Sequence, residues 1–226
     1  MKNTCYIVLF TVLSIASSCR KENSDLTNSA GGTSADSYYP TTKGSEWTYR
    51  ATTSGSSTTM TSTQIMSGAT ATYNNQTYYE SIATIANNPT TAKSFVYAAN
   101  NTYRIRSTTL AYGVSVELEF LRANAAIGDT WTTPANDAGK VNGIDARVKS
   151  TMKEKNISKV VNGKTFNNVI HSTVELQYNM SGGFETAATY EIYAAKGIGV
   201  ILIDSNIDLY GMTMNSKSEL ISYTIK

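Results

Sequence analysis

The chain has 226 residues, 41% of them hydrophobic, which is enough for one domain to bury a core of its own. It carries 19 basic and 17 acidic residues, a formal net charge of only +2, and no run of basic residues. This balance excludes the positively charged surface that nucleic-acid binding requires, so we expect no nucleic-acid partner.

The first nineteen residues, MKNTCYIVLFTVLSIASSC, have the organisation of a secretory signal. Lys2 supplies positive charge, residues 6–16 form a compact apolar stretch, and three small residues precede Cys19. The apolar stretch is about half of the ~20 residues that a spanning helix needs, so a permanent transmembrane anchor is not expected. Small residues followed at once by a cysteine resemble the lipobox of bacterial lipoproteins. We predict a signal peptide over residues 1–18 and a membrane anchor made by lipid on Cys19.

Residues 19–37 are predicted to form the lipidated cysteine and a flexible tether. Residues 20–36 are polar and small, which is typical of a linker and not of a packed element. The triplet after Cys19, Arg-Lys-Glu, resembles the charged export signals of Bacteroidetes-type surface lipoproteins. The expected location is the outer membrane, on its periplasmic side or at the cell surface. Cys5 leaves with the signal peptide and Cys19 is acylated, so the mature domain has no disulfide.

From Tyr38 onward, apolar and polar residues alternate with the period of two that indicates half-buried strands. The clearest examples are residues 114–120, 143–155, 169–179 and 184–193, and in the last of these Phe184 is placed on the inner face. Turn residues at hairpin spacing separate the strands, as in Asn74-Asn75, Asn100-Asn101, Asn162-Gly163 and Gly182-Gly183. The apolar run 199–203 indicates a central strand or one covered on its second face.

We therefore predict one all-β domain over residues 38–226, with about ten strands and at most one or two short helices. The helical piece is expected near residues 121–126. A sheet of so many long strands must curl to bury its apolar face. The expected architecture is a single curved antiparallel sheet that forms a half-barrel or a barrel.

Four motifs are similar to those of a broad group of Bacteroidetes-type lipoproteins. They are the opening YYP-x-x-x-G-x-x-W-x-Y at residues 38–49, GDTW at 128–131, VNGKTFNNV at 161–169, and the late KGIGV within 193–201. Thr41 stands where that group usually has leucine. The resemblance implies a β-rich fold similar to the half-barrels of lipoprotein carriers of the LolA and LppX type. It implies no active site.

The motifs themselves indicate structural roles. Trp47 and Trp131 are large side chains suited to anchor a core. Gly197 and Gly199 suit a turn or bulge where a strand begins.

No catalytic or metal-binding constellation stands out, and we expect no cofactor and no enzymatic activity. His171 is the only histidine and is expected on a wet strand face, with no cysteine or serine motif to join it. Glu117 and Glu119 point the same way, roughly 6.5–7 Å apart along a strand, and are also expected on a wet face. Residues 204–208 offer oxygen ligands but lack the glycine and glutamate of a calcium loop.

Three functions remain open. The first is a non-enzymatic carrier that holds an apolar small molecule or lipid inside the curved sheet. Its expected lining is Val116, Leu118, Val174, Leu176 and Tyr190. The second is a surface protein that binds glycan or a partner protein through some of its 15 tyrosines. The third, a hydrolase, is the least favoured because no constellation supports it.

Overall fold

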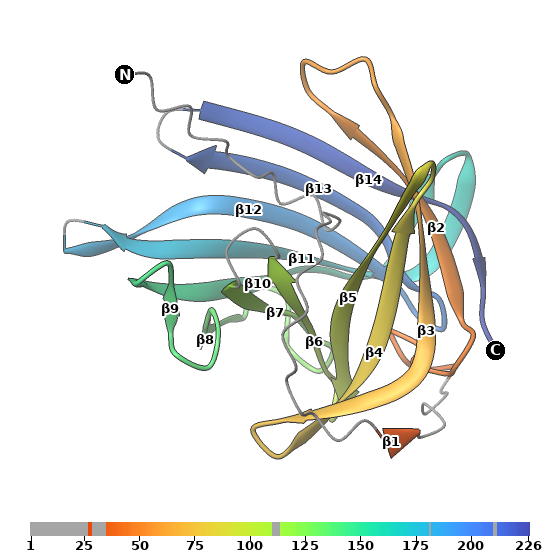
Figure 1. The fold of residues 1–226 in the computed structure, drawn as a ribbon, viewed down its shortest axis with the longest axis horizontal. Helices are drawn as coiled ribbons and strands as arrows, with labels where there is room; N and C mark the ends of the chain where they lie inside the picture. The colour runs from red at the N-terminus through yellow and green to blue at the C-terminus, as the bar shows by residue number, and fades with distance from the viewer. Residues whose placement is uncertain (1–26, 29–34, 110–113, 181, 210–211) are drawn as a thin grey trace.

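The computed structural model describes residues 27–28, 35–109, 114–180, 182–209 and 212–226. The predicted signal peptide, most of the tether and Cys19 lie outside the described residues. The described chain forms fourteen strands in one antiparallel sheet (Figure 1). They are β1 (Thr27–Asn28), β2 (Glu46–Thr53), β3 (Met60–Tyr73), β4 (Gln76–Ile85), β5 (Asn88–Ala99), β6 (Thr102–Thr109), β7 (Val114–Arg122), β8 (Thr130–Pro134), β9 (Lys140–Val141), β10 (Ile144–Val161), β11 (Lys164–Met180), β12 (Gly183–Ala195), β13 (Gly199–Leu209) and β14 (Met212–Thr224).

The all-β prediction is confirmed: the described residues contain no helix, and hence none that could span a membrane. The short helix expected near residues 121–126 is wrong. Strand β7 continues through Arg122 because Leu121 is 1% exposed and pairs with Tyr103 of β6. A tight turn then follows, with the Ala125 amide donating to the Arg122 carbonyl.

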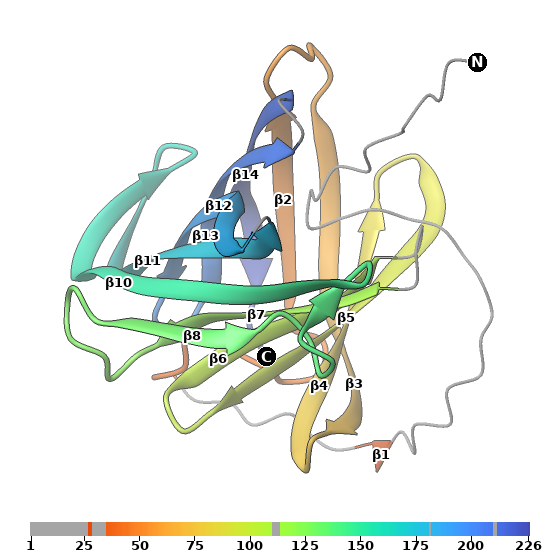
Figure 2. The same ribbon diagram turned by 90° about the vertical axis from the view of Figure 1, so that its left-hand side faces the viewer.

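The strand order is β7-β6-β5-β4-β3-β2-β14-β13-β12-β11-β10-β8. Most neighbours in this order follow one another in the chain, whereas the pairing of β2 with β14 joins the two ends of the domain. In Figure 1 the strands β3 to β5 run up the picture while β10 to β13 run across it. The sheet therefore folds over on itself into a nearly closed barrel, with the apolar core between its two halves (Figure 2).

Asparagine and glycine residues make three of the four predicted tight turns, whereas Gly183 of the fourth already belongs to β12 and pairs with Met180. Asn74 and Asn75 have φ of 50° and 60°, so β3 ends at Tyr73 and β4 starts at Gln76. The pairs at 100–101 and 162–163 also have positive φ at both positions, which is the geometry of the two-residue hairpin turn.

Side-chain donors close the barrel at the free edge of β7. The Trp131 indole and the Ser150 hydroxyl donate to the Glu119 carbonyl, at 3.2 and 2.8 Å. The Ser172 hydroxyl donates to the Phe120 carbonyl at 2.6 Å. An exposed strand edge would leave these carbonyls without hydrogen-bond donors. Side chains from β8, β10 and β11 supply the donors, although β7 does not pair with a further strand along this edge.

The opening and late motifs meet at one end of the barrel, which we call the closed end (Tyr39, Trp47, Tyr49 and the turn 196–199). The Trp47 indole donates to the Ile198 carbonyl at 2.6 Å, and the Tyr49 hydroxyl donates to the Val200 carbonyl at 2.9 Å. Trp47 is 1% exposed and its ring lies 5.5 Å from that of Tyr39. The prediction that Trp47 anchors the core is confirmed.

Gly199 shows why the late motif contains glycine. Its φ is 112°, and a Cβ there would lie 3.3 Å from the Trp47 indole nitrogen. The strand pairing slips by one residue beside it, between Tyr193 and Ala194 of β12, which is the predicted bulge.

Candidate functional site

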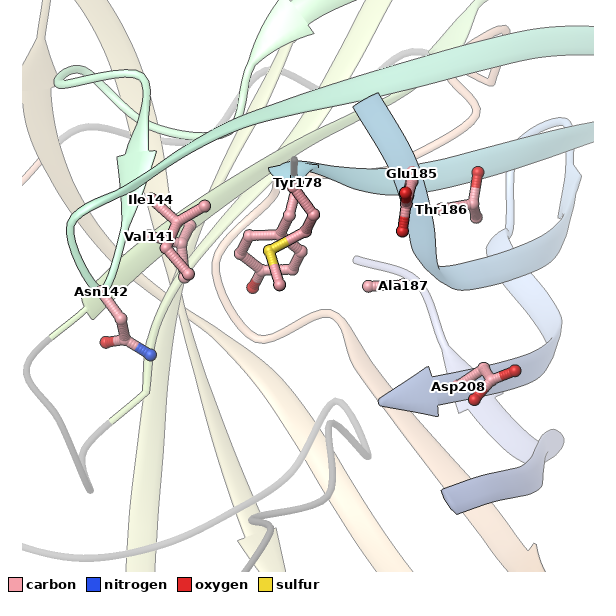
Figure 3. Close-up of a pocket in the computed structure, with 9 residues that line it drawn as sticks. Val141, Asn142, Ile144, Tyr178, Glu185, Thr186, Ala187 and Asp208 are labelled. Carbon is pink, nitrogen blue, oxygen red and sulfur yellow. The ribbon is translucent and has the colours of Figure 1, made fainter. Parts of the chain in front are cut away.

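A pocket of about 370 Å³ lies at the opposite end of β11 and β12 from the closed end (Figure 3). Strands β9 and β10 form one wall, the end of β11 forms the floor, and β12 and β13 form the other wall. Its apolar residues are Val141, Ile144, Tyr178, Met180 and Ala187, and its polar residues are Asn142, Glu185, Thr186 and Asp208. We call this pocket and its rim the open end.

A β-bulge shapes the wall made by β12. Leu176 pairs with Ala188 but Gln177 pairs with Thr186, so Ala187 is an extra residue that faces the pocket. Beyond the bulge the alternation is reversed, and Glu185 shares a face with Tyr178. Sequence alternation placed Phe184 on the inner face, which is wrong.

Phe184 instead lies on the outer face and is 38% exposed. The Arg147 guanidinium covers its ring at 3.9 Å from the centroid.

The polar part of the rim is acidic. Glu185 and Asp208 are exposed, whereas Tyr178, Met180 and Ala187 below them are half-buried. In the described part of the chain neither carboxylate has an ion pair or hydrogen bond to another residue, and no lysine, arginine or histidine lines the pocket. The open end thus combines an apolar floor with two unpaired acidic groups.

The five residues predicted to line a ligand cavity lie in the core next to this pocket. Val174 pairs directly with Tyr190, and Leu176 follows on the same inner face. Val116 and Leu118 come from the inner face of β7, and the five belong to one apolar cluster. All but the half-buried Leu118 are at most 5% exposed, and none of the five lines the pocket. Their role in ligand binding stays a prediction.

Tyr190 connects that core to the pocket. It lies on β12 beyond Ala188, and burial raises the pKa of its hydroxyl above the usual tyrosine value, with the neighbouring Tyr178 adding to the rise. Tyr178 in turn lines the pocket floor. The apolar inner face therefore runs without interruption from the core to the open end.

The sequence signals for the pocket residues were uneven. Ile144 and Tyr178 fall within the alternating segments 143–155 and 169–179, but nothing sets them apart from the other apolar residues of their strands. Val141 sits in a strand of two residues, too short to show alternation. Ala187 faces the pocket only because of the bulge, which leaves no mark in the residue pattern.

His171 is not on a wet face, which corrects the expectation. It is 9% exposed and stacks on Tyr193 with the ring centroids 4.1 Å apart. Its two ring nitrogens lie 2.9 Å from a Glu154 carboxylate oxygen and 2.6 Å from one of Glu191. The Thr173 hydroxyl donates to the same oxygen of Glu191. Strand β11 is therefore covered on both faces at this point.

Glu119 is not on a wet face either. It is 1% exposed and accepts charge-assisted hydrogen bonds from Arg104 and Arg122, each at 2.6 Å. Glu117 accepts from the Tyr78 hydroxyl at 2.8 Å and lies 3.7 Å from Arg106. The two glutamates hold the second face of β7 and have no free carboxylate pair to offer a substrate.

The tyrosines pack the sheet and do not form an exposed strip. None of those with described side chains is exposed. Tyr78 and Tyr97 are buried together with their rings 5.4 Å apart, and burial raises the pKa of Tyr78 to about 12. Arg104 lies over the Tyr97 ring at 4.9 Å. Tyr112 and Tyr210 lie outside the described residues.

Metal ligands do not gather in the described part of the chain: no three His, Cys, Asp or Glu residues come close enough to hold an ion. Residues 204–208, considered for calcium, lie within the continuous strand β13. That extended backbone does not bring their oxygens to one point.

No protein-family model matches the sequence, and no curated protein matches it. The structure is similar to a crystal structure from Bacteroides fragilis that is assigned as an exported protein with a YmcC-like fold. The TM-score is 0.51 with 11% sequence identity, over 84% of this chain and 99% of that one. A crystal structure assigned as a lipoprotein of Parabacteroides distasonis has a TM-score of 0.48 with 13% identity, over 85% of this chain and 100% of that one. At this identity the first similarity shows a shared fold, and no functional residue is transferred.

Proposed function

We propose that the protein is a lipid-anchored extracytoplasmic carrier or binding module that holds an apolar ligand at the open end. The observation that carries the proposal is the pocket of about 370 Å³, floored by Tyr178 and Met180 and continuous with the apolar inner face. Ligand pockets are typically concave, mostly apolar and about 300–1,000 Å³ in volume. At the small end of that range, the pocket suits one acyl chain or a small apolar molecule.

The proposed role is non-enzymatic. The candidate catalytic groups are engaged in contacts that hold the sheet together: His171 with two glutamates, and Glu119 with two arginines. A glycan platform, the alternative function, needs exposed tyrosines, and none is exposed among the described tyrosine side chains. These observations favour the carrier over both the hydrolase and the glycan-binding protein.

We propose that the protein is located at the outer membrane and is attached to it by lipid on Cys19. Its support is the signal-like N-terminus with a cysteine directly after small residues, together with an exported protein of similar fold. Two or more acyl chains on one cysteine hold a protein on a bilayer, since each buried methylene contributes about 0.8 kcal/mol.

The anchor is tested with Cys19→Ser in the native host. The variant should lose labelling by an alkyne fatty acid and move from the membrane to the soluble fraction. A matched Cys5→Ser variant should keep both the label and the membrane location, because Cys5 leaves with the signal peptide. Labelling that persists in Cys19→Ser would refute the anchor.

The carrier role is tested by lipid extraction and native mass spectrometry of protein purified from the host. An apolar molecule should accompany the wild type and be lost from Ala187→Trp, whose indole fills the pocket. Phe184→Ala is the control, because Phe184 lies on the same strand and faces away from the pocket. A bare wild-type protein, or a ligand retained by Ala187→Trp, would contradict the carrier role.

A further inference from the structure

The charge of the pocket rim limits which polar head group a ligand can carry. Glu185 and Asp208 are its charged residues, and both are exposed and unpaired within the described chain. Asn142 adds a neutral polar group, whereas the Thr186 hydroxyl already accepts a hydrogen bond from the Gln177 amide at 3.1 Å. A ligand whose chain lies on Tyr178 would bring its polar end to these side chains.

The basic residues near the rim are already engaged elsewhere. The Lys140 ammonium lies 3.0 Å from the Asp145 carboxylate. The Arg147 guanidinium lies over the Phe184 ring on the outer face, and its Nε donates to Gln177 at 2.8 Å. No cation is therefore directed at the pocket from the strands that form its walls.

This charge pattern is the opposite of what a fatty acid or a phosphate head would need. Sites for carboxylates and phosphates present arginine or lysine, whose N–H groups pair with the anionic oxygens. Two acidic side chains repel such a head and attract a donor that carries positive charge.

We propose that the ligand is a single-chain amphiphile whose polar end is an amine. Its chain lies on the apolar floor, and its ammonium group lies at the rim, where Glu185 and Asp208 supply negative charge. This inference rests on the proposed carrier function and specifies the ligand class for the same pocket. The pocket volume favours one chain, and the charge of the rim favours the amine.

The test compares three ligands with the same twelve-carbon chain: dodecylamine, dodecanol and dodecanoic acid. Affinities are measured by calorimetry at pH 7, below the concentration at which each ligand forms micelles. The amine should bind about tenfold more tightly than the alcohol, as expected for two solvent-exposed ion pairs, and the acid should bind more weakly than the alcohol. Added salt should reduce the preference for the amine, because salt screens exposed charges.

The double variant Glu185→Gln, Asp208→Asn should bind all three ligands with similar affinity. Both side chains are exposed, so the variant should keep the far-UV circular dichroism and the melting temperature of the wild type. Asp204→Asn is the matched control: it removes an exposed carboxylate from the same strand as Asp208 but outside the pocket, and it should leave the preference unchanged.

The outcomes separate the two proposals. If the acid binds as tightly as the amine, or if the double variant still prefers the amine, the head-group inference is overturned while the carrier role stands. If none of the three binds, or if Ala187→Trp binds them as well as the wild type, the carrier role itself is overturned.

Discussion

The two ends of the barrel use the same kinds of residue to opposite effect. At the closed end Trp47 and Tyr39 are at most 3% exposed, and the indole is hydrogen-bonded to the Ile198 carbonyl. At the open end Tyr178 and Met180 are only half-buried, and the Glu185 and Asp208 carboxylates have no ion pair or hydrogen bond within the described chain. Aromatic and apolar side chains therefore contribute to stability at one end and leave a surface to be covered at the other.

The comparison indicates that one end of the barrel contributes mainly to stability and the other mainly to binding. Tyr39 and Tyr49 at the closed end are 3% and 7% exposed, and this burial raises the pKa of both hydroxyls above the usual tyrosine value. A pocket with a half-open apolar floor gains free energy only when something occupies it. Substitutions at the closed end should therefore change stability, whereas those at the open end should change binding.

The largest expected effect is that of Trp47→Ala. The variant leaves a cavity and an unpaired Ile198 carbonyl, so we expect it to lose about 3–5 kcal/mol of unfolding free energy. Trp47→Phe should lose less, because the ring keeps most of the packing. Met180→Ala at the open end should lose at most about 1 kcal/mol, because its side chain is half-exposed.

The measurement is urea unfolding of the soluble Cys19→Ser protein. If Trp47→Ala proves unfolded, the ranking of Trp47→Phe against Met180→Ala still tests the comparison. Equal losses of unfolding free energy from Trp47→Phe and Met180→Ala would contradict the proposed difference between the two ends.

Sequence alternation predicted the core because it depends only on neighbouring residues. The face of β10 that carries Ala146, Val148 and Met152 is buried, in agreement with the alternation over residues 143–155. The turns at 74–75 and 100–101 were placed correctly because asparagine tolerates the positive φ that a two-residue hairpin requires. Both signals are local, and the sequence displays them directly.

The errors arise where contacts or strand pairing that the residue pattern does not show decide the outcome. Alternation predicts an exposed Glu119, but its carboxylate is 1% exposed and is held by Arg104 of the neighbouring strand and by Arg122. Phe184 changed face because of a bulge three residues away. The pocket joins Val141 to Asp208, which no local pattern relates. Alternation tells which face a side chain takes, but not what covers that face.

The smallest expected loss of stability concerns the loop before β9, the strand that carries Val141 of the pocket wall. Asp137 lies in the loop before β9, and Arg106 donates to both of its carboxylate oxygens, at 2.9 and 2.6 Å. Asn74 donates to one of them at 2.8 Å. The side chain of Asp137 is 47% exposed, so solvent screens this pair and we expect Asp137→Asn to lose at most about 1 kcal/mol at pH 7.

The pH dependence of that loss identifies its cause. The hydrogen bonds from Arg106 lower the pKa of Asp137 below its ordinary value of 3.8, more than its partial burial raises it. A carboxyl with a lowered folded-state pKa contributes stability above its unfolded value and loses it as the pH falls through the folded value. The difference between wild type and Asp137→Asn should therefore be largest at neutral pH and vanish in acid. Asp145→Asn, which breaks an exposed pair with Lys140, should show a smaller difference in the same urea series. A loss from Asp137→Asn that stays constant below pH 3.8 and into stronger acid would mean that packing of the loop, and not the ion pair, causes the loss.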